Sequence, residues 1–282
     1  MKYREIAEGV FIDRPNRFIA HADVNGTVET VHVKNTGRCK ELLVPGAAVR
    51  LEVSDNPKRK TKYDLVMVYK QGLGWVNMDS QAPNKVVAEW LAAGDYDLVK
   101  PEYTYGKSRI DFYMEKNGEK HLLEVKGCTL EVDGIGYFPD APTERGVKYL
   151  HELEQAQQAG YRCAVAFVIQ MEGVTEVRLN IRTQPEFGTA LAQAKAAGVR
   201  ALFLLCHVGR DTLNANRVMP DGGVYQVDFF TDTKKLEKEK KLKQAMLGIK
   251  GKYGKNAILK ASSFEESAMG ESAGIKQSEA EP

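Results

Sequence analysis

The sequence predicts an α+β protein made of a small closed β-barrel and a following mixed sheet with helices on both of its faces. Two observations predict this fold class. Within the first 75 residues, short β-branched or alternating segments are separated by turn-forming residues. After Pro83, helical patterns alternate with apolar, strand-like runs, which is the order typical of an α/β sheet. The 282 residues are enough for both parts and a tail.

The barrel is predicted from five short strands. They are residues 17–23, 28–33, 48–53, 63–69 and 75–78. Turn formers such as Asn25-Gly26 and Pro45-Gly46 separate them. Five strands in so short a segment suit a closed barrel, and the OB type is the first candidate. Strand propensity alone does not separate an OB barrel from an SH3-like one.

The second part is predicted to have the order αβββαβαβ. Its elements are a helix at 84–93, strands at 98–105, 108–114 and 121–132, a helix from the N-cap Thr143 to 159, a strand at 162–169, a helix at 185–197 and a strand at 200–208. Asn117-Gly118 is a strong hairpin signal between the second and third strands. The last two strands are mostly apolar, as strands buried on both faces are.

The distribution of charge divides the chain at positions close to the predicted domain boundaries. Residues 1–75 carry 13 Lys/Arg against 9 Asp/Glu (net +4), residues 76–233 carry 16 against 22 (net −6), and residues 234–282 carry 11 against 7 (net +4). We predict an OB-like barrel domain at 1–80, a mixed-sheet domain at 81–233 and a basic, flexible tail at 234–282. A basic front and an acidic middle suggest that phosphate affinity and chemistry lie in different places.

Membrane, secreted and zinc proteins do not fit this composition. The longest apolar runs, 163–169 and 199–208, are far shorter than the ~20 residues of a membrane span. The first residues lack the apolar core of a signal peptide. The four cysteines form no Cys-x-x-Cys pair, and Cys163 and Cys206 are predicted to pack inside strands. We expect a cytoplasmic protein without a membrane partner.

Two charged residues interrupt the otherwise apolar run HLLEVKGCTLEV. Glu124 and Lys126 are two residues apart in a strand, so their side chains share one face. Asp111 lies on the preceding strand of the hairpin and can face them. The two carboxylates and the carbonyl of Val125 offer the oxygen ligands that Mg²⁺ prefers, with Mn²⁺ as the alternative. The Lys126 ammonium can stabilise charge on a phosphate, so the pattern predicts metal-assisted phosphodiester hydrolysis.

A purely structural interpretation of these charges stays open. An acidic residue two positions before a lysine also occurs at Asp232/Lys234 and Glu239/Lys241, in or beside the charged tail. Only Glu124 and Lys126 interrupt an apolar strand, where charges are costly unless they are paired or bind a ligand. A cross-strand salt-bridge cluster near a sheet edge would satisfy them too.

Further charged residues are candidates for catalysis or for DNA contacts. Glu89, in the middle of the first helix, is a candidate catalytic carboxylate, with a solvated helix face as the alternative. The segment GYFPDAPTERG (136–146) places Asp140 and Arg145 at a helix start, where anions bind readily. The candidate nucleic-acid contacts, for which plain surface charge is the alternative, are Arg38, Lys40, Lys58, Arg59, Lys60, Lys62, Arg145 and Lys148.

Four segments resemble the sugar fermentation stimulation protein A (SfsA) family. They are VKNTGRCKELLVPGA, YGKSRIDF, LLEVKGCTL and GYFPDAPTERGVKYLHEL, in this order. The resemblance covers about residues 1 to 230 and implies an OB-like barrel followed by a domain of the PD-(D/E)XK nuclease superfamily. It further implies DNA binding and a role in regulating sugar (maltose) utilisation. By the same resemblance, Asp111, Glu124 and Lys126 match the superfamily's metal carboxylates and lysine, and Glu89 matches the acidic residue of its first helix. Ile110 stands where the superfamily's name has proline.

The sequence favours a DNA-binding regulator on a nuclease-type scaffold. Two alternatives stay open: a Mg²⁺-dependent DNA endonuclease, and a ligand-sensing interaction protein without nucleic acid. The complete set of Asp111, Glu124 and Lys126 argues against a decayed scaffold. The lack of a helix-turn-helix candidate weakens the case for a sequence-specific regulator.

Overall fold

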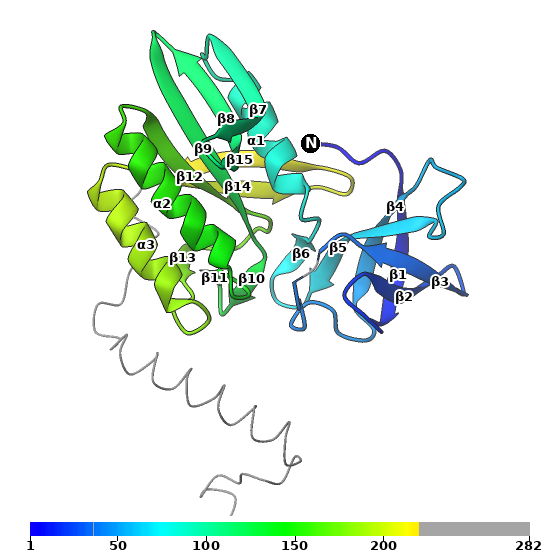
Figure 1. The fold of residues 1–282 in the computed structure, drawn as a ribbon. Coiled ribbons are helices and arrows are strands. Elements are labelled where there is room, and N and C mark those ends of the chain that lie inside the picture. The colour runs from blue at the N-terminus through cyan, green and yellow to red at the C-terminus, as the bar shows by residue number, and fades with distance from the viewer. Residues whose placement is uncertain (36, 220–282) are drawn as a thin grey trace, which may run out of the picture. The chain divides into compact units, whose positions relative to one another are not determined.

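Five strands near the N-terminus close into a barrel (Figure 1). In a computed structural model, which describes residues 1–35 and 37–219, they run in the order β3-β2-β1-β4-β5, and a parallel pairing of β3 with β5 closes the ring. The strands are β1 (Ile6–Asp13), β2 (Ile19–Val24), β3 (Thr27–Val33), β4 (Ala48–Val53) and β5 (Tyr63–Lys70). A short β6 (Gly74–Asn77) pairs with β5. The predicted OB-like barrel is confirmed.

Within the barrel, the sequence prediction missed strand β1. The prediction placed no strand at Ile6–Asp13 and counted residues 75–78 instead, which overlap β6 outside the closed ring. Gly9 in the middle of β1 hides the pattern, because glycine weakens a strand and is depleted there. The structure shows why glycine is needed: a Cβ at Gly9 would lie 2.7 Å from the carbonyl oxygen of Asp23 in β2.

After the barrel, the chain forms a six-stranded mixed sheet in the order β15-β14-β12-β9-β8-β7. Its strands are β7 (Leu98–Tyr105), β8 (Ser108–Lys116), β9 (Glu119–Cys128), β12 (Arg162–Ile169), β14 (Arg200–Val208) and β15 (Leu213–Met219). The strands β9, β12 and β14 are parallel, while β7, β8 and β9 form an antiparallel meander. The predicted mixed sheet is confirmed, although β15 was not predicted.

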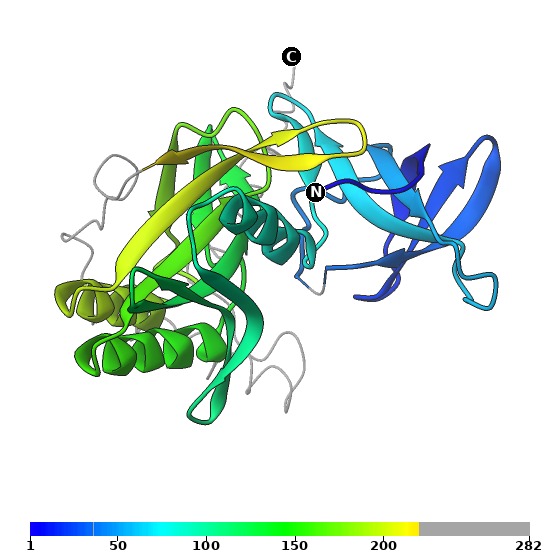
Figure 2. The same cartoon turned by 90° about the horizontal axis from the view of Figure 1, so that it is seen from above.

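Three helices of the described part of the chain cover this sheet. α1 (Ala82–Ala92) packs on one face, and α2 (Glu144–Gln158) and α3 (Pro185–Ala196) lie together on the other (Figure 2). Thr143 caps α2 as predicted, because its side-chain oxygen accepts a 3.1 Å hydrogen bond from the Gly146 N–H. No helix within the described part of the chain is long and apolar enough to cross a bilayer. The predicted tail at 234–282 lies outside the described residues.

A small three-stranded sheet was not predicted. It contains β10 (Leu130–Val132), β11 (Ile135–Phe138) and β13 (Glu176–Leu179). The sequence prediction joined β9 and β10 into one strand at 121–132. These strands are too short, at three or four residues, to show a clear alternation of polar and apolar side chains.

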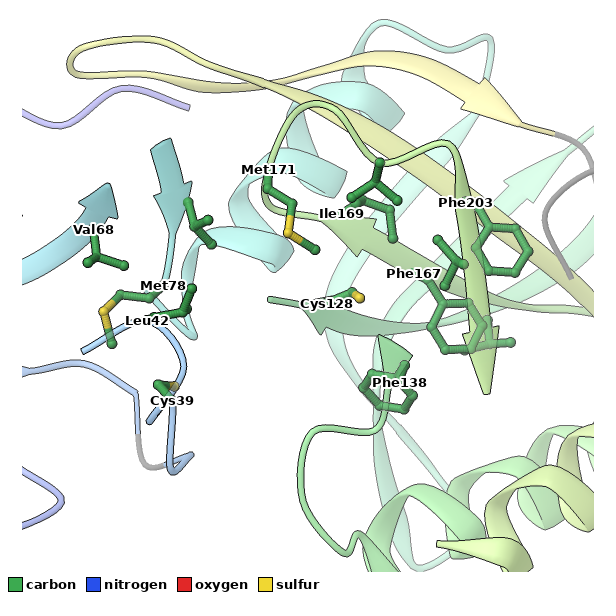
Figure 3. Packing of buried hydrophobic residues seen from close by; sticks show 14 of the residues in the cluster. Cys39, Leu42, Val68, Met78, Cys128, Phe138, Phe167, Ile169, Met171 and Phe203 are labelled. Carbon is green, nitrogen blue, oxygen red and sulfur yellow. The ribbon is translucent and has the colours of Figure 1, made fainter. Parts of the chain in front are cut away.

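Alternate residues of β12 belong to two hydrophobic clusters. Val165 and Phe167 pack on the side of α2 and α3, whereas Ala166 and Val168 pack on the side of α1. Successive side chains of a strand point to opposite faces, so this alternation buries both faces of the sheet. The first cluster continues into the barrel, as Figure 3 shows. Barrel and sheet therefore share one core, and the described residues belong to one compact unit.

One buried amide joins the sheet to the segment between barrel and α1. Gln170 follows β12 and is 2% exposed. Its Nε2 donates to the carbonyl oxygen and Oδ1 of Asn77, both at 3.0 Å, and to the carbonyl oxygen of Asp79 at 3.1 Å. The amide nitrogen of Gln170 is thus a hydrogen-bond donor with three acceptor oxygens around it.

We expect Gln170→Glu to lower the free energy of unfolding by about 2 kcal/mol, because a carboxylate would face three oxygens without the amide N–H groups that bind them. Urea unfolding measures this loss. The control is Gln71→Glu, the same change at an exposed turn. Equal midpoints for the two variants would contradict the structural role of Gln170.

Candidate metal-dependent site

The hairpin of β8 and β9 opens at the candidate site. Backbone pairing between these strands ends at Phe112↔Leu123, one step before Asp111 would face Glu124. Beyond this point the Asp111 side chain replaces a backbone partner, because its Oδ2 accepts a 2.7 Å hydrogen bond from the N–H of Val125. The end of the ladder therefore places the Asp111 carboxylate between the two strands.

The other oxygen of Asp111 is held by a residue that the sequence interpretation missed. Oδ1 accepts a 2.7 Å hydrogen bond from Nδ2 of Asn84, in the first turn of α1. Helical spacing offers a signal for this residue: Asn84 lies three and seven residues before Val87 and Leu91, which are both buried. A polar residue on the buried face of a helix needs a polar partner.

Glu124 is nearly inaccessible to solvent, at 4% exposed. Its Oε1 lies 2.5 Å from Nζ of Lys126. Its Oε2 is buried and has no hydrogen-bond partner among the described residues. Burial raises the pKa of Glu124 to about 7, although the Lys126 charge opposes this shift, and the nearby Asp111 raises the pKa further. The site thus contains a carboxylate oxygen that lacks a donor.

Lys126 is held between Glu124 and an aromatic ring. Its Nζ lies 5.1 Å from the centroid of the Tyr149 ring, in α2. The Lys126 side chain is 16% exposed, and a ring face stabilises such a partly desolvated cation. Tyr149 was not identified from the sequence, because a tyrosine in an amphipathic helix is most often a core residue. The structure thus brings Asp111, Glu124 and Lys126 together, with Asn84 and Tyr149 beside them.

Glu89 is not among these residues. Its Oε2 lies 2.5 Å from the Met1 amino group, and its side chain is 61% exposed. Glu89 comes five residues after Asn84, about 140° further round the helix, so the two side chains leave α1 in different directions. The N–H of Val125 donates a hydrogen bond to Asp111. The role of the Val125 carbonyl oxygen as a metal ligand stays a prediction.

The basic residues of the barrel loops fall into two groups. Five of the predicted contacts are exposed, namely Arg38, Lys40, Lys58, Lys60 and Lys62. Arg59 instead forms an ion pair with Asp64, at 2.9 and 2.6 Å. Burial alone would raise the pKa of Asp64, but hydrogen bonds from Arg59 and His32 and the charge of Lys34 lower it to about 2. Arg59 therefore has a structural partner that the sequence did not reveal.

The two predicted contacts near α2 also differ. Arg145 is exposed in the first turn of the helix. Lys148 donates a 2.9 Å hydrogen bond to Oγ of Ser108 and lies 3.5 Å from Glu152. The loop that contains Arg38 approaches this region, since a Cβ at Gly37 would lie 2.6 Å from Oδ2 of Asp140. Basic residues of the barrel and of the α2 start therefore occupy neighbouring segments.

Comparison with known proteins finds matches along most of the chain. The family model described as "SfsA N-terminal OB domain" matches residues 12–78, and the model described as "Sugar fermentation stimulation protein RE domain" matches residues 81–212. A sugar fermentation stimulation protein homolog of Desulfitobacterium hafniense (strain Y51) is 52% identical over 218 residues, which are 76% of this chain and 95% of the relative. A homolog of Clostridium beijerinckii is also 52% identical over 218 residues, covering 76% and 96%. A solved structure of Pyrococcus furiosus SfsA in complex with Ca²⁺ matches with a TM-score of 0.67 at 22% identity, covering 80% of this chain and 98% of that one.

Proposed function

This chain belongs to the sugar fermentation stimulation protein (SfsA) family, and from that premise we propose that it is a DNA-binding protein with a metal-dependent phosphodiesterase site of the PD-(D/E)XK type. The observation that carries the proposal is the buried Oε2 of Glu124, which has no partner among the described residues and lies in a site with Asp111 and Lys126. A buried carboxylate oxygen without a donor is costly, so a function is the simplest reason to keep it.

The donor set fits a hard divalent cation. Glu124 and Asp111 are carboxylates, and Mg²⁺ binds through one or two carboxylates while it keeps several waters. The Pyrococcus furiosus relative was solved with Ca²⁺, but our choice of Mg²⁺, or Mn²⁺, rests on ligand chemistry. When bound, the ion would polarise a phosphoryl oxygen and make a bound water more acidic.

The side chains of the chain itself then have distinct tasks. Asn84 and the Val125 N–H orient the Asp111 carboxylate through its two oxygens. The Tyr149 ring and Glu124 orient the Lys126 ammonium. That ammonium can donate to a water or to a phosphate oxygen and stabilises the negative charge that develops during cleavage.

We place the DNA contacts mainly on the barrel. The segment 1–75 has a net charge of +4, whereas 76–233 has −6, so phosphate attraction favours the front of the chain. OB barrels bind strands of nucleic acid along a basic face. The segments of Gly37 and Asp140 are adjacent, so DNA bound to the barrel could extend to the sheet domain at this point.

The double variant Lys58→Glu/Lys60→Glu tests the barrel surface. We expect its DNA affinity to fall by about tenfold or more at moderate salt, and the slope of log K against log[salt] to shrink by about 2, because two phosphate contacts are lost. Fluorescence anisotropy with labelled DNA measures both. Lys100→Glu/Lys120→Glu makes the same charge change on β7 and β9, and an equal loss there would refute a specific role for the barrel loop.

A second candidate function is a DNA-binding regulator that does not cut. One observation favours it: both oxygens of Asp111 already accept a hydrogen bond, so each has only one remaining lone pair for a metal ion. Incubation of supercoiled, linear and single-stranded DNA with the protein and Mg²⁺ or Mn²⁺ separates the two candidates. Metal-dependent cleavage supports the nuclease. Binding without cleavage supports the regulator, and a complete lack of DNA binding at low salt refutes both.

A further inference from the structure

One end of the sheet face under α1 lacks a covering helix among the described residues. α1 has 11 residues and is therefore about 16 Å long. It packs against β9, β12, β15 and β7, whereas α2 and α3 together cover the other face. Next to α1, where β9, β12 and β14 begin, the structure has a pocket of about 290 Å³. This volume is close to the lower end of the range for small-molecule sites.

The floor and walls of this pocket are apolar and aromatic. Trp90 of α1 and Tyr96 supply aromatic rings, and Leu123, Ala164 and Leu202 come from the three parallel strands. These five side chains are partly buried or buried and belong to the cluster on the α1 side of the sheet. A flat apolar body would remove this surface from water, which is the main source of affinity in such sites.

The charged side chains of the pocket rim are two arginines, Arg162 and Arg200, and one carboxylate, Glu119. Arg162 is paired with Glu119 at 2.9 Å, but the side chain of Arg200 is exposed, and its guanidinium forms no ion pair or hydrogen bond with any residue that the structure describes. Nε2 of His121 is also buried here without a hydrogen-bond partner in the described chain, although Oε2 of Glu119 lies 4.0 Å away. Burial lowers the pKa of His121, and the charges of Arg162 and Lys116 lower it further against the opposing effect of Glu119. An unpaired guanidinium and an unsatisfied imidazole nitrogen suit an anionic group.

We propose that this pocket binds a small planar organic anion, an aromatic ring system with a single carboxylate, sulfonate or phosphate group. The ring packs on Trp90 and the strand floor, and the acidic group meets Arg200 and Nε2 of His121. The pocket is separate from the candidate metal site, because successive side chains of β9 alternate between faces and Glu124 lies on the α2 side. The proposal therefore does not depend on DNA cleavage and survives if cleavage is never observed.

The probe for the test is 1-anilinonaphthalene-8-sulfonate, an aromatic sulfonate. The chain has two tryptophans, so Trp75→Phe in the full-length protein leaves Trp90 as the fluorescent reporter in the pocket wall. We expect saturable quenching of Trp90 emission with one site. Arg200→Glu should weaken binding of the probe by about tenfold or more, because a carboxylate that repels the sulfonate replaces a guanidinium that attracts it. The uncharged analogue N-phenyl-1-naphthylamine should bind more weakly by a similar factor.

The control variant is Lys120→Glu, which makes the same charge change at an exposed position next to His121. It should leave the affinity within about twofold. A second variant, Ala164→Leu, adds bulk to the pocket floor and should remove the site. Unfolding midpoints show that each variant is folded. Absence of quenching, equal affinity in the Arg200→Glu and control variants, or equal binding of the uncharged analogue would each overturn the proposal.

Discussion

Asp111→Asn should reduce metal-dependent DNA cleavage by about 1000-fold or more while DNA binding stays intact. The amide keeps the shape of the carboxylate but loses its charge, which is what a divalent cation needs from this position. It also has only one acceptor oxygen for two donors, the Asn84 amide and the Val125 N–H. One of these hydrogen bonds is lost, so we also expect a stability loss of about 1 kcal/mol.

Two measurements separate chemistry from folding in this experiment. Cleavage of supercoiled DNA with Mg²⁺ gives the activity, and anisotropy in EDTA gives the DNA affinity without metal. The control is Asp133→Asn in the turn between β10 and β11, where the positive φ of 53° suits asparagine as well as aspartate. If wild type, Asp111→Asn and Asp133→Asn cleave equally, any cleavage comes from a different site and the proposed one is inactive.

Much of the fold was predictable because periodicity is strong in long elements. The strand at 162–169 and the strand at 200–208 coincide with β12 and β14, and Thr143 was identified as the cap of α2. The elements that were missed have short or interrupted patterns. β1 contains Gly9, which is explained only by its contact with β2, and a contact between strands cannot be read from one of them alone.

The site was predictable only in part, for a related reason. Alternation along β9 placed Glu124 and Lys126 on one face, and the hairpin signal placed Asp111 on the adjoining strand. The partners Asn84 and Tyr149 come from helices on opposite faces of the sheet. Helical spacing indicates which helix residues face the sheet, but it does not indicate which strand residue each of them contacts. The predicted catalytic role of Glu89 stays a prediction, and its side chain in α1 has the Met1 amino group as its partner.

The second large effect that we predict concerns the buried carboxyl group of Glu124, which should make the stability of the protein depend on pH. The pKa of Glu124 in the folded protein is raised to about 7 from an ordinary value of 4.5. Between these two values the folded protein holds a proton that the unfolded chain has released. Stability therefore falls as pH rises from about 4.5 to about 7 and then reaches a plateau. The buried carboxylate thus destabilises the metal-free protein at neutral and higher pH.

Glu124→Gln should remove this pH dependence and stabilise the metal-free protein by roughly 2–3 kcal/mol at pH 8, with little change near pH 5. The glutamine oxygen can still accept from Lys126, so the variant keeps that contact without the buried charge. Urea unfolding in EDTA at several pH values measures the difference between variant and wild type. A difference that is constant across pH would mean that Glu124 does not titrate in this window. Loss of DNA cleavage in a variant that is more stable than wild type would identify Glu124 as a residue kept for function at a cost in stability.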